Sequence, residues 1–127
     1  EQLDNEKNDV IEKSKGERIS YLDACKFRNE KDLSVDALSV FRSYAEHGGP
    51  KGPESLNTRY LYEDVPMGLG TLSLLGKYAD VATKLTDSLI TIASFLVKKK
   101  FYEQARTLED FGLRDISFDD FVKFINS

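Results

Sequence analysis

Residues 84–97 constrain the fold of this chain more than any other segment. Nearly every position from Lys84 to Val97 is apolar or small, and a helix that is apolar almost all round belongs at the centre of a domain. The segment is too short, and too marked by Thr, Ser and Asp, to cross a membrane. Three lysines follow it, where cationic side chains favour a helix C-terminus. We therefore expect a central helix surrounded by others.

The remaining chain consists of amphipathic patterns separated by breaks. Helices are expected over 2–14, from Ser20 through at least Cys25, over 34–48, 66–79 and 106–113, and from 117 onward. The expected N-caps are Ser20, Ser34, Thr107 and Ser117, with Gly112 as the stop of its segment. Residues 48–50, Gly-Gly-Pro, form the strongest break. Because no segment alternates as a strand does, the sequence predicts an all-α fold, a single compact domain of about six to seven helices.

Composition limits the classes of function. A net charge of −4 without a basic stripe argues against nucleic-acid binding. The single cysteine, Cys25, excludes internal disulfides, favours a reducing, cytoplasmic compartment, and is expected in the core. The only histidine, His47, is expected on the surface near a helix end, and without clustered ligands it predicts no metal site. No membrane segment or signal peptide is expected, and the start without Met is typical of an excised domain.

The densest cluster of functional residue types is RYLYEDVPMGL at residues 59–69. Pro66 suits the first turn of a helix, so Val65 is expected to be extended and Glu63 and Asp64 to precede the helix N-terminus. Two interpretations stand at this point. Either the acids cap this helix and Arg59 forms a local ion pair, which the residue types alone favour, or Arg59 binds a carboxylate in a cleft while Asp64 orients a base.

Three further features accompany this motif: LLG at 74–76, Asp87 at the head of an apolar helix, and RTLEDFGL at 106–113. Together they resemble the C-terminal helical domain of the octopine/nopaline (opine) dehydrogenase family. LDNE at 3–6 adds to the resemblance, which runs from about residue 3 to 113. It implies enzymes that condense an amino acid with pyruvate or another 2-oxo acid and reduce the imine with NADH or NADPH. In such enzymes an N-terminal Rossmann domain binds the nucleotide.

The resemblance also implies roles for two residues. Arg59 is expected to bind a substrate carboxylate, as a planar guanidinium does best, and Asp64 to partner a catalytic histidine. The sequence has neither a nucleotide-binding glycine motif nor a suitably placed histidine. Residues 1–127 are therefore expected to be the substrate-binding domain, inactive alone, with NAD or NADP bound elsewhere. Lys84 departs from the proline usual in the family at that helix start.

Two alternatives stay open. A helical protein-interaction module predicts an exposed apolar patch in place of a pocket around Arg59 and Asp64. The helical domain of another Rossmann-type dehydrogenase, acting on a hydroxy acid or sugar acid, is disfavoured because the central helices carry no lysine-based catalytic motif. The sequence selects neither the amino acid nor the nucleotide, and it leaves a homodimer open.

Overall fold

The computed structural model describes residues 1–49 and 51–127, and the described residues contain helices and loops without strands. The helices are α1 (Gln2–Lys13), α2 (Tyr21–Asn29), α3 (Ala37–His47), α4 (Arg59–Tyr62), the π-helix η1 (Asp64–Leu69), α5 (Gly70–Tyr78), α6 (Lys84–Val97), α7 (Phe101–Gln104) and α8 (Phe118–Ile125). Six of these helices have eight residues or more. The predicted all-α fold is confirmed; Pro50, part of the expected break, lies outside the described residues.

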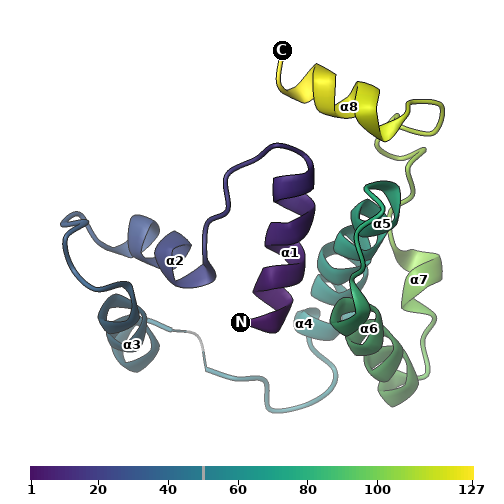
Figure 1. Ribbon diagram of the computed structural model, residues 1–127. Coiled ribbons are helices and arrows are strands. Elements are labelled where there is room, and N and C mark those ends of the chain that lie inside the picture. The colour runs from purple at the N-terminus through teal and green to yellow at the C-terminus, as the bar shows by residue number, and fades with distance from the viewer. Residues whose placement is uncertain (50) are drawn as a thin grey trace.

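The core lies where η1, α6 and α7 meet. Val65, Ile90, Ala93 and Phe101 form its buried cluster. Figure 1 shows α4 to α7 gathered on one side of α1, with α2 and α3 on the other. The latter two helices pack chiefly on each other.

The expected helix at 84–97 forms over those same residues, but it is enclosed on one face only. The side chains of Thr86, Ile90 and Ala93 are buried. On the opposite face Ile92, Phe95 and Leu96 are exposed, Phe95 by 85%. The prediction of a helix enclosed all round is therefore wrong for this face, because no other helix of the described chain covers it.

Helix α6 is capped by a residue of α1. Thr83, at the N-cap position, makes no side-chain cap hydrogen bond. Instead the carboxylate of Glu6 accepts hydrogen bonds from the N–H of Leu85 (2.7 Å), the N–H of Thr86 (2.9 Å) and Oγ1 of Thr86 (2.7 Å). Free amides and the dipole at a helix N-terminus favour such an anion. This contact fixes α1 against the central helix.

The same helix holds the segment that leads into α2. Asp4 Oδ2 accepts a hydrogen bond from the N–H of Tyr21 (2.8 Å), and Asn8 Oδ1 accepts one from the N–H of Ile19 (3.3 Å). Asp4 and Asn8 are one turn apart, so they present both acceptors on one side of α1. Helix α1 therefore links the α2–α3 pair to the core helices.

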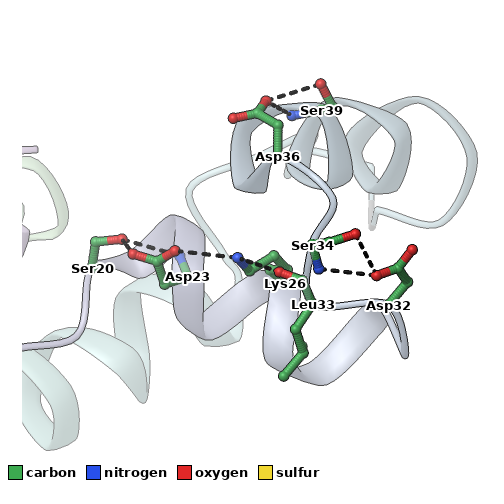
Figure 2. Close-up of polar contacts among 8 residues, drawn as sticks. All are labelled: Ser20, Asp23, Lys26, Asp32, Leu33, Ser34, Asp36 and Ser39. Atoms are coloured by element: carbon green, nitrogen blue, oxygen red, sulfur yellow. Dashed lines mark hydrogen bonds and ion pairs between the residues drawn. The ribbon is translucent and has the colours of Figure 1, made fainter.

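The caps of α2 and α3 confirm one prediction and correct another (Figure 2). Ser20 accepts a hydrogen bond from the N–H of Asp23 (3.0 Å), as expected for an N-cap. Helix α3 is capped by Asp36, whose carboxylate accepts from the N–H of Ser39 (2.9 Å), and not by Ser34. The N–H and hydroxyl of Ser34 are bound to Oδ1 of Asp32, so this serine closes the preceding turn.

The C-terminal third differs most from the prediction. Residues 108–112 form turns and not the expected helix, with the Thr107 hydroxyl hydrogen-bonded to Asp110 (2.9 Å). Gly112 has φ +68°, the left-handed backbone expected of a stop residue. Helix α7, which the sequence did not predict, is instead held by the buried ring of Phe101.

Helix α8 has the expected N-cap at Ser117 and docks on α5 through aromatic contacts. The Tyr78 ring meets those of Phe118 and Phe121 at 5.4 and 5.8 Å between centroids. At its far end, Asn126 donates a hydrogen bond to the carbonyl of Ser14 after α1 (3.2 Å). The prediction of a docked terminal helix is confirmed.

We predict that Glu6→Ala lowers the free energy of unfolding by about 2 kcal/mol, since it leaves the α6 N-terminus without its acceptor. Glu6→Gln should cost less because one carbonyl oxygen remains. Urea unfolding of both variants measures this, with Asn5→Ala, an exposed α1 residue, as control. An Ala variant as stable as the control would contradict the capping role.

Acidification provides an independent test. Burial of Glu6 opposes its ionisation, but the hydrogen bonds from Thr86 and Leu85 outweigh burial and lower its pKa. The folded pKa therefore lies below the unfolded one, so this contribution is present above about pH 4.3 and is lost as the pH falls through the folded pKa. The stability difference between wild type and Glu6→Gln should shrink over that range in unfolding curves recorded from pH 7 to pH 3.

Candidate functional site

The candidate site residues Arg59 and Asp64 lie in one continuous helical path. Thr58 caps α4 by accepting from the N–H of Tyr60 (3.1 Å), so the helix begins at Arg59. The backbone then continues through Glu63, whose N–H donates to the carbonyl of Arg59 (2.7 Å). The expectation that the helix begins at Pro66, with Val65 extended and the acids before it, is wrong. The acids lie within the helical path, about one turn after its start.

Pro66 is accommodated by a widened turn. The segment Asp64–Leu69 is a π-helix, and the N–H of Gly70 reaches the carbonyl of Val65, five residues back. A proline lacks the N–H that a regular α-helical ladder needs, and a local π-turn is one way to pass such a position. Val65 and Pro66 are buried, so core packing holds this turn in place.

The guanidinium of Arg59 makes two long ion pairs in solvent. Nε lies 3.6 Å from Glu63 Oε2, and Nη2 lies 3.9 Å from Asp64 Oδ1. The Arg59 side chain is 69% exposed and that of Asp64 is 53% exposed. Pairs this long and this exposed contribute little to stability. The local ion pair of the first interpretation is therefore present, yet it leaves the guanidinium accessible to an incoming anion.

The backbone beneath these charges is well anchored. On the opposite side of the path, Val65 belongs to the core cluster, and Leu61 packs against it. The ring of Tyr62 meets the buried ring of Phe101 edge-on, with 6.2 Å between centroids. Arg59 and Asp64 thus project from a supported helix surface. The nearest groove along the chain begins one turn later, at Gly68, Leu69 and Leu72.

A second polar cluster joins α5, α6 and α7. Asp87 Oδ1 accepts hydrogen bonds from the hydroxyls of Ser73 (2.5 Å) and Tyr102 (2.8 Å). Partial burial, together with the bond to Asp87 and its negative charge, raises the pKa of Tyr102 to about 12, so the phenol stays protonated. The sequence marked Asp87, but its partner Tyr102 could not be identified because α7 was not predicted. The cluster therefore holds α5, α6 and α7 together through hydrogen bonds.

Cys25 and His47 lie where the sequence predicts them, in the core and on the surface. Cys25 is buried, with Sγ 3.4 Å from the Asn29 side-chain amide. His47 is exposed in the last turn of α3, with Nδ1 3.1 Å from the Ser43 carbonyl. In residues 1–49 and 51–127 no three His, Cys, Asp or Glu side chains gather as metal ligands would. None of the helices described is long and apolar enough to cross a membrane.

Comparison with known proteins identifies the family of this helical domain. Residues 1–97 match the model of the family described as NAD/NADP octopine/nopaline dehydrogenase, alpha-helical domain. A protein named opine dehydrogenase from Arthrobacter sp. (strain 1C) is 44% identical over 69 residues. That match covers 54% of this chain and 19% of the Arthrobacter protein. The chain therefore corresponds to a minor part of that relative's length.

We predict that Arg59→Ala changes the free energy of unfolding of this chain by no more than about 0.5 kcal/mol, because its ion pairs are long and exposed. Chemical unfolding of the isolated chain measures this. Arg18→Ala is a matched control that should cost more, since Arg18 Nη1 lies 2.6 Å from Asp9 and 2.9 Å from Glu12. A larger loss for Arg59→Ala than for Arg18→Ala would favour a purely structural role for Arg59.

Proposed function

This chain belongs to the octopine/nopaline dehydrogenase family, whose alpha-helical domain it contains, and on that premise we propose that it is the substrate-binding part of an opine dehydrogenase. In the proposed reaction the amino group of an amino acid condenses with the carbonyl of a 2-oxo acid such as pyruvate, with loss of water. NADH or NADPH then delivers a hydride to the imine carbon. The product is a secondary amine that carries both carboxylates.

The observation that carries this proposal is the exposed guanidinium of Arg59, whose two ion pairs are long. Both substrates present carboxylates, and a guanidinium binds the two oxygens of a carboxylate with parallel hydrogen bonds. The nearest acids to Arg59 are 3.6 and 3.9 Å away, beyond hydrogen-bond distance. A substrate carboxylate can therefore take up donors that are unused in the described part of the chain. We assign the role of substrate-carboxylate ligand to Arg59.

Asp64 is proposed to orient a histidine from the rest of the protein. Its carboxylate is exposed and faces Arg59. A carboxylate hydrogen-bonded to one imidazole nitrogen fixes the tautomer and stabilises the imidazolium formed when the other nitrogen takes a proton. Such a base is needed to deprotonate the amino group before it attacks the carbonyl. In this role Asp64 acts through the histidine.

The nucleotide is proposed to bind outside this chain. Its site belongs to a Rossmann domain of the same protein, and the helical domain supplies the opposite wall of the cleft. The reaction as proposed needs no metal. Residues 1–127 alone are expected to lack activity, because both hydride donor and histidine come from elsewhere. A cytoplasmic location belongs to the proposal, since free Cys25 and a nicotinamide reductant fit a reducing compartment.

The exposed apolar face of α6 supports an interaction with a further domain. Ile92, Phe95 and Leu96 are spaced i, i+3 and i+4, so they share one side of the helix. A face of this kind is typical of an interface. Because the Arthrobacter match covers only 19% of that protein, most of such an enzyme lies outside this chain. We propose the remaining domain as occupant, which also accounts for the patch that an interaction module predicts.

The catalytic roles are tested in the full-length protein by steady-state kinetics. Arg59→Ala should raise the KM of the amino acid or the 2-oxo acid about 100-fold, with Arg59→Lys intermediate. Asp64→Asn should lower kcat by about 100-fold or more while changing the KM values less. The KM for the nucleotide should stay within about twofold in each variant. Wild-type kinetics in both Arg59→Ala and Asp64→Asn would refute the assignment.

The α6 interface is tested by Phe95→Asp. In the isolated chain the variant should keep its melting temperature, since Phe95 is 85% exposed, and bind less of a hydrophobic dye. In the full-length protein it should lower the melting temperature by several degrees. Ser43→Asp, an exposed polar position on α3, which lies across α1 from α6 (Figure 1), serves as control. An unchanged full-length protein would show that no domain packs there, and dissociation of a dimer would identify a second copy as the occupant.

A further inference from the structure

Glu63 is the third charged residue on the surface that carries Arg59 and Asp64. Its N–H donates to the Arg59 carbonyl at 2.7 Å, and the N–H of Met67 donates to the Glu63 carbonyl at 2.9 Å. Arg59, Glu63 and Met67 therefore follow one another at four-residue spacing along one side of the helical path. Since the side chains of Glu63 and Arg59 are both exposed, the Glu63 carboxylate shares the solvent-facing side with the guanidinium.

The two acids meet the same edge of the Arg59 guanidinium. Glu63 Oε2 lies 3.6 Å from Nε, and Asp64 Oδ1 lies 3.9 Å from Nη2. In the planar fork, the N–H of Nε and one N–H of Nη2 point along one edge, whereas Nη1 and the second N–H of Nη2 form the other edge. A carboxylate can be bound by two parallel hydrogen bonds at such an edge. Because both acids lie along the Nε–Nη2 edge, the Nη1–Nη2 edge is the one open to a substrate.

The charges of this cluster favour different roles for the two acids. One guanidinium faces two carboxylates, so the cluster carries one excess negative charge. When Asp64 binds the histidine, as proposed, Glu63 is the acid that remains with Arg59. In the part of the chain that the structure describes, Glu63 forms no ion pair except this one. Their attraction strengthens as water leaves a closing cleft, because the dielectric falls.

We propose that Glu63 is a positioning residue, which holds the Nε edge of Arg59 so that the Nη1–Nη2 edge binds the substrate carboxylate. The inference rests on the proposed function and adds the residue that orients its carboxylate ligand. A long, exposed arginine side chain has many rotamers. An acid one turn along the same surface restricts them before the substrate arrives, which lowers the entropy cost of binding. Glu63 acts through Arg59 and does not contact the substrate.

The test is a double-mutant cycle in the full-length protein, measured by steady-state kinetics. Arg59→Ala identifies the substrate whose KM depends on the guanidinium. Glu63→Ala should raise the same KM about tenfold, with kcat and the nucleotide KM within about twofold of wild type. In the Arg59→Ala background, Glu63→Ala should change that KM by less than about twofold, because the group that it orients is gone.

A conservative variant and a matched control complete the experiment. Glu63→Gln keeps a carbonyl oxygen that can accept from Nε, so its KM should lie within about threefold of wild type. Glu12→Ala is the control, since Glu12 is 65% exposed, as Glu63 is, and pairs with Arg18. Glu12 lies in the last turn of α1, whereas the first turns of that helix lie beside the η1–α5 junction. This variant should keep kcat and every KM within about twofold of wild type.

The outcomes separate the role of Glu63 from the reaction. A wild-type KM in Glu63→Ala, with a raised KM in Arg59→Ala, overturns the positioning role and leaves the reaction intact. A rise that persists in the Arg59→Ala background also overturns it, because Glu63 then contacts the substrate itself. A fall in kcat together with the melting temperature, at an unchanged KM, identifies a merely structural residue. Absence of turnover with every amino acid overturns the proposed function, and the inference with it.

Discussion

The contact between Glu6 and the N-terminus of α6 is the interaction on which the rest of this fold depends. Three hydrogen bonds converge on one carboxylate, and they outweigh the desolvation cost that burial imposes on it, since the Glu6 pKa is lowered. The partners are about eighty residues apart in sequence. The central helix thus acquires its N-terminal cap only when α1 has docked, so docking of α1 and formation of α6 are coupled steps.

The position of the candidate site follows from that coupling. Helix α6 contributes Ile90 and Ala93 to the cluster that also buries Val65 of η1. Burial of Val65 and Pro66 leaves the other side of the path, with Arg59 and Asp64, facing solvent. Asp87 in turn binds hydroxyls from α5 and α7. The polar groups around α6 therefore fix the helices, and the charges on α4 and η1 stay exposed to solvent.

Features encoded locally could be predicted from the sequence. The 3.6-residue periodicity predicts α1, the continuous apolar run predicts the bounds of α6, and Ser20 and Ser117 have the N-cap pattern. Local signals fail where two neighbouring residues both suit an N-cap position, as Ser34 and Asp36 do for α3.

Long-range contacts decided the rest of the fold. A helix through Pro66 requires a π-turn held by core packing, and four-residue α7 requires the buried ring of Phe101. Within the site, the resemblance of the 59–69 motif to the family predicts Arg59 and Asp64, because their residue types alone favour a local ion pair. The groove at Gly68 unites residues from α1, α2 and α5, which no local pattern reveals.

The exposure of Arg59 and Asp64 has a physical rationale in a two-domain enzyme. Burying a guanidinium and a carboxylate within one domain would incur the desolvation cost during folding and would saturate their hydrogen bonds with each other. The Arg59–Asp64 pair is 3.9 Å apart and exposed to solvent, so little free energy is needed either to maintain or to separate it. If a second domain covers this surface, the substrate carboxylate and the histidine then supply the partners as water leaves. Interactions that form only at that step strengthen in the lower dielectric, so in the proposed reaction binding energy would be applied where the imine forms.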